Sequence, residues 1–381
     1  MYFRKDICVL SIVLLIGGFL LVSVECNTNE SNTDINNKDQ ADNISLIHNK
    51  TIGNDESADE NYLLFRPSDV TVDSTGNVYV LDSGNYRIQK YDSNGNYAQT
   101  IGDRGQGPGE FNNSFSLRRM ILRENEIFVF ELIAAERGKI HVFSTTGKFL
   151  RQMRVPFETY GIEMIDENKF LIPYGRGDRT NTVYLDINLI PGSTESEIRS
   201  FKSESLMALV DINGNIEREF GAPRRFDEER IEYSVNESYK AIDKDKNIYL
   251  AFNYLNRIDK YKSNGDLIFS IDRPLQVEEE YHIFEQELSG RKIKDVAAMY
   301  ISSGIGIDYR NRVWIPTYTA VPHGGMHVSE YKIFEIYSDN GELIMKIPVP
   351  ERYTFMRTLG DRLYLIDYLN AWIHEYTIVD N

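Results

Sequence analysis

Short stretches of alternating apolar and polar residues fill the chain from about residue 65 onward. The clearest set lies in residues 65–111, where four runs read DVTVD, NVYVLD, RIQKYD and YAQTIG. Alternation with a period of two is typical of a β-strand that packs one face on a core. Stretches rich in Asp, Ser, Asn and Gly separate the runs, and Asn-Gly suits a tight hairpin turn because both residues accept a positive φ. The pattern predicts a four-stranded antiparallel meander.

The hairpins of this meander recur along the chain. Copies of the hairpin between its third and fourth strands contain Asn-Gly or Thr-Gly and begin at Tyr91, Phe143, Val210, Tyr261 and Tyr337. The hairpin between the first and second strands recurs six times. Repetition of one four-stranded unit is the sequence signature of a β-propeller. We therefore expect a single all-β domain of six four-stranded blades over residues 61–381.

The two ends of this domain predict how the ring closes. The sixth copy stops after its third strand because the chain ends at Asn381. Residues 61–65, NYLLF, precede the first blade and have no partner in the linear pattern. We expect them to supply the missing strand, since closing the ring with both ends removes exposed sheet edges. Between blades four and five, the apolar spacing of residues 273–299 predicts a short helical insertion.

The first blade resembles an NHL repeat. It has the start Pro-x-Asp-Val-x-Val-Asp-x-x-Gly-Asn from Pro67 and the centre Asp-Ser-Gly-Asn-x-Arg-Ile from Asp82. Its tail, GQGPGEF, is similar to six-bladed propellers that are common among exported bacterial proteins. The resemblance implies a six-bladed propeller. It implies little about activity, because propellers carry many unrelated functions.

The N-terminus predicts export. Residues 1–25 place Arg4 and Lys5 before a long apolar run, which is typical of a secretory signal and is also long enough to remain as a membrane anchor. Cys26 and a polar stretch follow, and this arrangement resembles a bacterial lipoprotein signal in which the cysteine carries the lipid, although Glu25 departs from that pattern. Lipid attachment, an uncleaved anchor and secretion all remain open. Each places the protein outside the cytoplasm, in the periplasm or at the cell surface.

Residues 26–60 are rich in Asn, Asp and Ser and contain no Phe, Trp or Tyr. Such a segment buries too little apolar surface to order itself, so it predicts a disordered polar tether. The whole chain carries a formal net charge of −16. This charge disfavours a nucleic-acid partner, because binding to nucleic acid depends on the neutralisation of phosphates.

Nearly all insertions fall in two classes of loop, those between second and third strands and those that connect blades. Both classes emerge on one face of a propeller, so this loop-rich face is the predicted binding face. The loops contain seven arginines, Arg104, Arg118, Arg119, Arg176, Arg179, Arg224 and Arg225. A guanidinium binds carboxylate or sulfate groups through paired hydrogen bonds. The set predicts either an anion pocket or ion pairs with neighbouring acids.

A second recurring motif, Asp/Asn-x-x-Asn, lies in the loops between second and third strands. Its copies are Asp82/Asn85, Asn253/Asn256 and Asp367/Asn370. Side chains of this kind bond to nearby backbone groups in tight turns. We interpret the motif as a turn cap, and we expect Arg87 to contact its own blade.

Two places could hold a metal ion. His323 and His327 lie in the loop VPHGGMHVSE and could supply part of a zinc site, with no third ligand evident from spacing. The resemblance to six-bladed lactonases implies a possible Ca²⁺ in the central channel, and Asp69 and Glu163 stand at inner-strand positions that would suit it. From the same strands, cationic side chains would oppose a metal ion: Arg119, Lys240 and Arg357.

The sequence supports two functions. The first is a non-catalytic binding or scaffold module, tethered to a membrane, that engages a protein, peptide or glycan through its loop-rich face. We expect such a module to be monomeric and to need no cofactor. The alternative is a hydrolase or lyase that uses Ca²⁺ or Zn²⁺, but no Gly-x-Ser-x-Gly nucleophile motif or other reaction-specific pattern is present.

Overall fold

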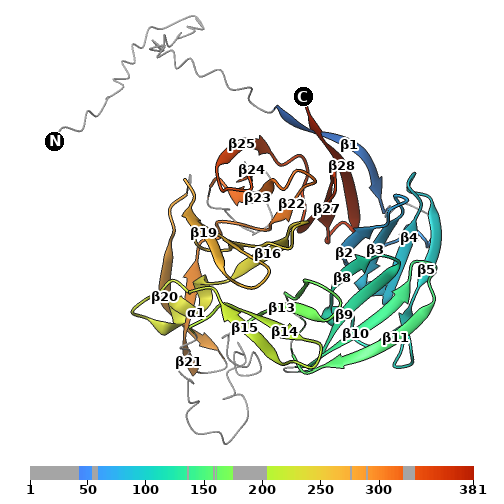
Figure 1. The fold of residues 1–381 in the computed structure, drawn as a ribbon, viewed down its shortest axis with the longest axis horizontal. Helices are drawn as coiled ribbons and strands as arrows, with labels where there is room; N and C mark the ends of the chain where they lie inside the picture. The colour runs from blue at the N-terminus through green and yellow to red at the C-terminus, as the bar shows by residue number, and fades with distance from the viewer. Residues whose placement is uncertain are drawn as a thin grey trace, which may run out of the picture. The chain divides into compact units, whose positions relative to one another are not determined.

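Six four-stranded antiparallel sheets follow one another along the chain as the blades of a β-propeller (Figure 1). The computed structural model describes residues 43–53, 59–134, 137–157, 159, 161–174, 204–274, 277–288, 291–320 and 331–381. All of these residues belong to one unit, residues 41–381. The six sheets confirm the all-β propeller that the repeated hairpins predict.

Each of the first five blades is built from four strands in chain order. Blade one contains β2 (Pro67–Val72), β3 (Val78–Asp82), β4 (Arg87–Tyr91) and β5 (Tyr97–Ile101). Blade two contains β8 (Leu117–Arg123), β9 (Glu126–Ala134), β10 (Arg137–Ser144) and β11 (Phe149–Val155). Blade three contains β12 (Glu163–Met164), β13 (Lys169–Pro173), β14 (Met207–Asp211) and β15 (Ile216–Phe220). Blade four contains β16 (Ser238–Ile242), β17 (Ile248–Phe252), β18 (Arg257–Tyr261) and β19 (Leu267–Asp272). Blade five contains β22 (Gly306–Ile307), β23 (Val313–Tyr318), β24 (Lys332–Tyr337) and β25 (Leu343–Pro348).

Short elements occupy the loops between these strands. Two 3-10 turns, η1 (Ser83–Asn85) and η2 (Ser114–Ser116), lie in blade one and just before blade two. The connection between these blades also contains a short parallel pair, β6 (Asp103–Arg104) and β7 (Glu110–Phe111). An α-helix, α1 (Glu229–Val235), lies between blades three and four. No helix in the described part of the chain is long and apolar enough to cross a membrane.

The ring closes between the two ends of the unit. Blade six contains β26 (Phe355–Leu359), β27 (Arg362–Asp367), β28 (Trp372–Asp380) and, as its outermost strand, β1 (Ile44–Ile52). In Figure 1, β1 in blue lies beside β28 in red, and the two pair antiparallel from Ile44 opposite Asp380 to Ile52 opposite Ile373. The prediction that an N-terminal strand closes the ring is confirmed. The prediction that residues 61–65 form this strand is wrong.

The true closing strand lies within residues 26–60, which the sequence predicted to be a disordered tether. That prediction is therefore wrong for residues 44–52. The pairing shifts between His48 and Lys50, where β1 carries a bulge. A bulge inserts one extra residue and breaks the period-two alternation, so the pattern of a strand was not visible. Residues 61–65 instead lie against blade one, where the carbonyl of Asn61 accepts a hydrogen bond of 2.8 Å from Tyr91 Oη.

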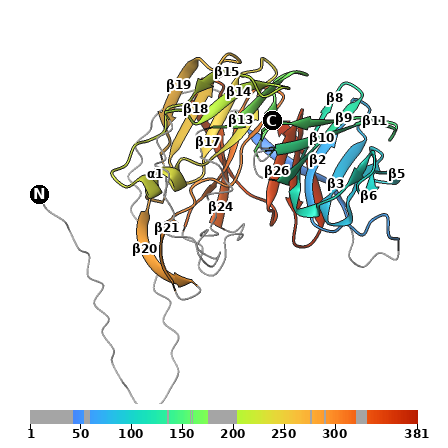
Figure 2. The same cartoon turned by 90° about the horizontal axis from the view of Figure 1, so that it is seen from below.

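The insertion between blades four and five is also different from its prediction. Instead of a helix, it forms the antiparallel hairpin of β20 (Tyr281–Leu288) and β21 (Arg291–Ala298). β-Branched Ile283 stands opposite Val296, an arrangement that favours a strand pair over a helix. Figure 2 shows α1 beside this hairpin, and the Phe226 and Tyr281 rings pack 5.1 Å apart near its base. The β-branched pair within the hairpin and the contact with Phe226 both favour the strands over the predicted helix.

An aspartate fixes the tight turn between the first and second strands of blade one. Asp73 Oδ1 accepts hydrogen bonds of 3.0 Å from the backbone N–H groups of Thr75 and Asn77. Gly76, which lies between them, has a φ of 85°, a left-handed conformation that favours glycine. In blade four, Asp243 accepts hydrogen bonds in the same way from the residues two and four positions ahead of it. The recurring aspartate is thus a determinant of the turn.

Apolar side chains fill the space between neighbouring blades. Between blades two and three, for example, the Phe130 and Phe170 rings lie 6.5 Å apart, and Phe157 packs 5.7 Å from Phe170. All three side chains are buried. Burial of one such side chain stabilises a fold by about 1.5–3 kcal/mol. This packing holds the six inner strands in position around the axis, where the candidate site lies.

Candidate functional site in the central channel

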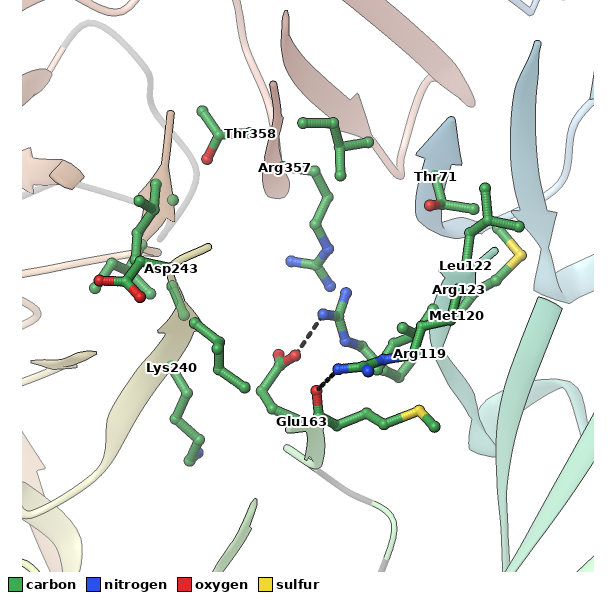
Figure 3. Close-up of a pocket in the computed structure, with 18 of the residues that line it drawn as sticks. Thr71, Arg119, Met120, Leu122, Arg123, Glu163, Lys240, Asp243, Arg357 and Thr358 are labelled. Atoms are coloured by element: carbon green, nitrogen blue, oxygen red, sulfur yellow. Dashed lines mark hydrogen bonds and ion pairs between the residues drawn. The ribbon is translucent and has the colours of Figure 1, made fainter. Parts of the chain in front are cut away.

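The inner strands of the blades enclose a cavity of about 450 Å³ (Figure 3). Its walls come from β2, β8, β12, β16, β22 and β26, together with the turn that follows β16. The cavity therefore lies in the central channel and reaches the face of the tight first–second turns. The loops that connect second and third strands contribute no residue to its described wall.

A buried carboxylate, Asp69 of β2, lies behind this wall. Its Oδ2 accepts hydrogen bonds from Arg119 Nη1 at 3.0 Å and from the backbone N–H of Met120 at 2.8 Å. Its Oδ1 accepts from Arg357 Nε at 2.6 Å. Burial raises the pKa of a carboxyl, but Arg357 and Arg119 outweigh it and hold the pKa of Asp69 below its usual value. Asp69 is therefore ionised, and both of its oxygens are occupied.

Arg119 of β8 links Asp69 to Glu163 of β12. Arg119 Nη2 donates to Glu163 Oε2 at 2.5 Å, and Figure 3 shows the two side chains meeting at the cavity wall. Burial lowers the pKa of a guanidinium, yet Glu163 and Asp69 together raise the pKa of Arg119 above its ordinary value. Its buried Nε has no hydrogen-bond partner in the described structure. One guanidinium thus ties three inner strands together.

Three further cations, Arg123, Lys244 and Lys246, line the cavity close to the first–second turns. Arg123 Nη2 donates to the carbonyl oxygens of Met164 at 3.0 Å and Ile165 at 2.5 Å. These acceptors are neutral, so they leave the charge of Arg123 uncompensated. None of the three cations forms an ion pair with an acid among the residues that the structure describes.

Lys246 occupies a backbone position that favours glycine. Its φ is 63°, in the left-handed region, and it stands at the turn position that Gly76 occupies in blade one. A side chain in this conformation costs about 1–2 kcal/mol relative to an ordinary backbone conformation. Strained residues of this kind concentrate at functional sites. Lys246 thus borders the channel from a backbone conformation that costs some stability.

The cavity is strongly cationic for so acidic a chain. Six cations line it, Arg119, Arg123, Lys240, Lys244, Lys246 and Arg357, against two acids, Glu163 and Asp243. With Asp69 behind the wall, the local formal charge is six minus three, or +3, in a chain whose net charge is −16. The Asp243 carboxylate is held within its own turn by the N–H groups of Asp245 and Asn247. A channel with one sign of charge concentrates ligands of the opposite sign.

The same geometry opposes a metal ion at Asp69 and Glu163. Both carboxylates bond to Arg119, and Asp69 also bonds to Arg357, so a metal ion would compete with guanidinium groups for them. Within the described ranges, no group of three side chains is arranged to ligate a metal. His323 and His327 lie outside the described residues, as does Cys26, the candidate lipid attachment site.

The predicted arginine set does not form one pocket. Of the seven, Arg176 and Arg179 lie outside the described residues. Arg119 belongs to the channel. Arg224 forms an ion pair with Glu279 at 2.6 Å, and Arg225 forms one with Glu232 at 2.5 Å. These two arginines are therefore paired with acids, although the acids are not the ones nearest to them in sequence.

The remaining two arginines of the set lie at the connection between blades one and two. Arg104 stacks over the Tyr86 ring, with its Cζ 5.1 Å from the ring centre. Arg118 Nε donates to the carbonyl of Phe115 at 2.9 Å. Neither forms an ion pair with an acid in the described parts of the chain.

The Asp/Asn-x-x-Asn motif caps its turn through backbone N–H groups at Asp367, whereas the Asp82 side chain accepts no hydrogen bond from the backbone of its own turn. Asp367 Oδ1 accepts from the N–H groups of Leu369 and Asn370, both at 3.0 Å. Asp82 Oδ2 accepts from Asn85 and from Arg87 Nε, each at 2.8 Å, which confirms the contact of Arg87 within its own blade. In the third copy, Asn253/Asn256, the Asn253 side chain does not bond within its turn, and its Nδ2 donates to Glu237 at 3.3 Å.

Sequence reasoning identified Arg119, Lys240 and Arg357 as channel residues but missed Arg123, Lys244 and Lys246. The position of Arg123 in the channel was predictable from the sequence. Residues two apart on a strand point to the same side, and Arg123 lies four residues after Arg119 on the same strand. The lysines lie in a turn, where a lysine is ordinarily solvated. Only the closed ring shows that this turn borders the channel.

Comparison with known proteins supports the fold and leaves the activity open. A family model for DUF5128, described as a 6-bladed beta-propeller, matches residues 28–203. No curated protein is similar to the chain in sequence. Among solved structures, the chain is similar to a DUF4221 family member from Bacteroides vulgatus at 11% identity and a TM-score of 0.55, over 90% of this chain and 100% of that one.

A second similar structure is a Bacteroides fragilis protein predicted to be exported. It has 12% identity and a TM-score of 0.51, over 91% of this chain and 98% of that chain. Identities this low show a shared fold and nothing finer. The chain is thus a six-bladed β-propeller, and its fold is similar over nearly its whole length to these two Bacteroides structures.

Proposed function

We propose that the protein is an extracytoplasmic, non-catalytic binding module that takes an anionic group of its ligand into the central channel. The observation that carries the proposal is the local charge of +3 around a cavity of about 450 Å³ in a chain of net charge −16. Carboxylate, phosphate and sulfate groups are the ligands that such a site recognises. A protein, peptide or glycan that also contacts the loop-rich face is compatible with this site.

Two features support a binding role over the alternative of a metal-dependent hydrolase or lyase. Asp69 and Glu163 form ion pairs with guanidinium groups and Asp243 is hydrogen-bonded within its own turn, which disfavours metal binding and proton transfer by these acids. The channel cations Arg123, Lys244 and Lys246 carry no ion pair within the described structure. Uncompensated cations that border a cavity favour the binding of anions.

The location rests on the N-terminal sequence. A basic start and a long apolar run before Cys26 are typical of export. Attachment to a membrane, through a lipid on Cys26 or through the apolar segment itself, belongs to the same proposal. Incorporation of a labelled fatty acid into the wild-type protein, compared with Cys26→Ser, distinguishes these two modes of attachment.

Thermal unfolding of the full chain tests the channel directly. A ligand that binds only the folded state stabilises it by about 2.7 kcal/mol at a hundred times its Kd. We expect phosphate, sulfate or succinate to raise the melting temperature more than sodium chloride of matched ionic strength. The double variant Lys244→Gln/Lys246→Gly should lose this additional increase, because it removes two of the cations that border the cavity.

The substitutions keep the test interpretable. Glycine relieves the left-handed strain at position 246, so the double variant should not be less stable than the wild type without ligand. Lys262→Gln is the matched control, since Lys262 is exposed in a hairpin turn of the same blade and does not line the cavity. An anion effect that is equal in all three proteins would contradict the proposal.

A further inference from the structure

A second surface, made of residues that do not line the cavity, combines exposed apolar side chains with arginine. It consists of Phe65, Arg66, Phe115, Arg118, Tyr368 and Leu369, and we call it the Arg66 patch. Phe65 and Arg66 precede blade one, Phe115 and Arg118 lie at the start of blade two, and Tyr368 and Leu369 lie between β27 and β28. These segments belong to the two loop classes that emerge on the loop-rich face. None of the six residues lines the cavity.

Large apolar side chains in this patch are unusually exposed. The exposed fraction is 56% for Phe65, 63% for Phe115 and 58% for Leu369. Single exposed apolar residues are common, but the contacts of Arg66 with Phe115 and Tyr368 bring these three segments together, and exposed apolar side chains grouped in this way mark an interaction surface. Gly84 lets Phe65 approach closely, because a Cβ there would lie 2.4 Å from the Phe65 ring and carbonyl oxygen.

Arg66 is held between two aromatic rings. Its Cζ lies 4.0 Å from the centre of the Phe115 ring and 5.2 Å from that of Tyr368. Its Nε donates to Tyr368 Oη at 2.5 Å, and Ser83 Oγ donates to its carbonyl at 2.6 Å. Its φ of 57° lies in the left-handed region, which is uncommon for a residue with a side chain. The backbone and both rings thus fix the orientation of this guanidinium.

The fixed guanidinium has no acidic partner. Neither Arg66 nor its neighbour Arg118 forms an ion pair with a carboxylate in the part of the chain that is described. Because Tyr368 occupies only Nε, the two terminal nitrogens of Arg66 remain for an incoming group. Two parallel N–H donors match the geometry of a carboxylate. In a chain with 58 acids and 42 bases, an arginine that is oriented yet unpaired indicates an acidic partner.

We infer that the Arg66 patch binds an acidic peptide segment of a partner protein, in which an Asp or Glu side chain lies beside a large apolar side chain. The carboxylate pairs with Arg66, and the apolar side chain packs on Phe115 and Leu369. Leu369 favours a peptide over a glycan, since an aliphatic side chain adds apolar area without an aromatic face for a sugar to stack on. This interaction is separate from the proposed channel site.

An array of synthetic octapeptides tests the inference. Each peptide pairs Leu, Phe or Trp with Asp or Glu, and each has a twin in which Asn or Gln replaces the acid. We expect the full-length protein to bind a subset of the acidic peptides at least tenfold more tightly than their amide twins. Arg66→Gln should bind both twins equally, because the oriented guanidinium is lost. Arg66→Lys should recover only part of the preference, since lysine lacks the paired donors.

Two control variants and one competing ligand make the result decisive. Arg154→Gln removes an exposed arginine of β11 that has no described ion pair, and it should keep the full preference. Lys244→Gln/Lys246→Gly should also keep it, which separates this surface from the channel. Equal binding of acidic and amide peptides by the wild type, or an unchanged preference in Arg66→Gln, overturns the inference. Arg66-dependent binding of dextran sulfate without binding of any peptide would assign the patch to a sulfated glycan and would equally overturn it.

Discussion

At the scale of single residues, buried acids hold the propeller together through networks with several donors. Glu131 of β9 is 1% exposed and accepts from His141 Nε2 at 3.0 Å and from the N–H groups of Asn112 and Asn113 at 2.9 and 3.0 Å. Lys139 Nζ lies 3.1 Å from the same carboxylate. Glu131 thus ties two strands of blade two to the connection from blade one.

This network predicts a specific pH dependence of stability. Burial raises the pKa of Glu131, but the hydrogen bonds from His141, Asn112 and Lys139 outweigh it and lower the pKa to about 2. Because the folded-state pKa lies below the unfolded value of about 4.3, the stabilisation is complete above pH 4.3 and is lost as the pH falls toward 2. Over that interval we expect Glu131 to contribute about 3 kcal/mol to the free energy of unfolding.

Urea unfolding between pH 2 and 7 measures this contribution. Glu131→Gln should lower the free energy of unfolding at pH 7 by about 2–3 kcal/mol and should flatten its decline in acid. Glu126→Gln is the matched control on the same strand, where the partly exposed pair with Arg151 should contribute about 0.5 kcal/mol. If both variants lose the same stability, the role assigned to Glu131 is wrong.

At the scale of elements, the outermost strand of blade six is the one that closes the ring. β1 (Ile44–Ile52) buries Ile44 and Ile52, which are 3% and 2% exposed. It also covers the edge of β28, which would otherwise expose unpaired backbone groups. The two buried isoleucines alone stabilise the fold by about 3–6 kcal/mol.

Two truncations test this closure. A chain that starts at Asn43 keeps β1, whereas a chain that starts at Gly53 lacks it. We expect the first to melt at the temperature of the longer protein and the second to melt much lower or to aggregate through the uncovered β28. Calorimetry and light scattering report both effects. Equal melting temperatures for the two truncations would show that β1 is dispensable.

At the scale of the whole molecule, the repeated four-stranded blade was predicted correctly from the sequence, whereas the closing strand and the insertion between blades four and five were not. Blade number and strand order follow from hairpin spacing, since hairpins with Asn-Gly or Thr-Gly turns recur with the strands they join. The closing strand was missed because its bulge at His48–Lys50 disrupts the alternation. The β20–β21 hairpin was predicted as a helix because its contacts with the residues around α1 are not visible in the local pattern.

The candidate site was only partly predictable for the same reason. Inner-strand positions identified Arg119, Glu163 and Arg357, which the structure brings together at one wall. Lys244 and Lys246 become channel residues only through the closed ring. Local sequence thus predicts the side chains that strands direct inward. It does not predict which turns from distant parts of the chain surround the cavity.

Charge is distributed unevenly over the molecule, and the proposed function depends on this distribution. The chain is acidic as a whole, while the channel carries a local charge of +3. The measurement that tests the claim most directly is anomalous diffraction from crystals of the protein soaked in millimolar selenate, a heavier analogue of sulfate. We predict a selenium peak in the channel beside Arg123, Lys244 or Lys246, which is absent from crystals of Lys244→Gln/Lys246→Gly. Selenium peaks confined to the outer surface of the blades would contradict it.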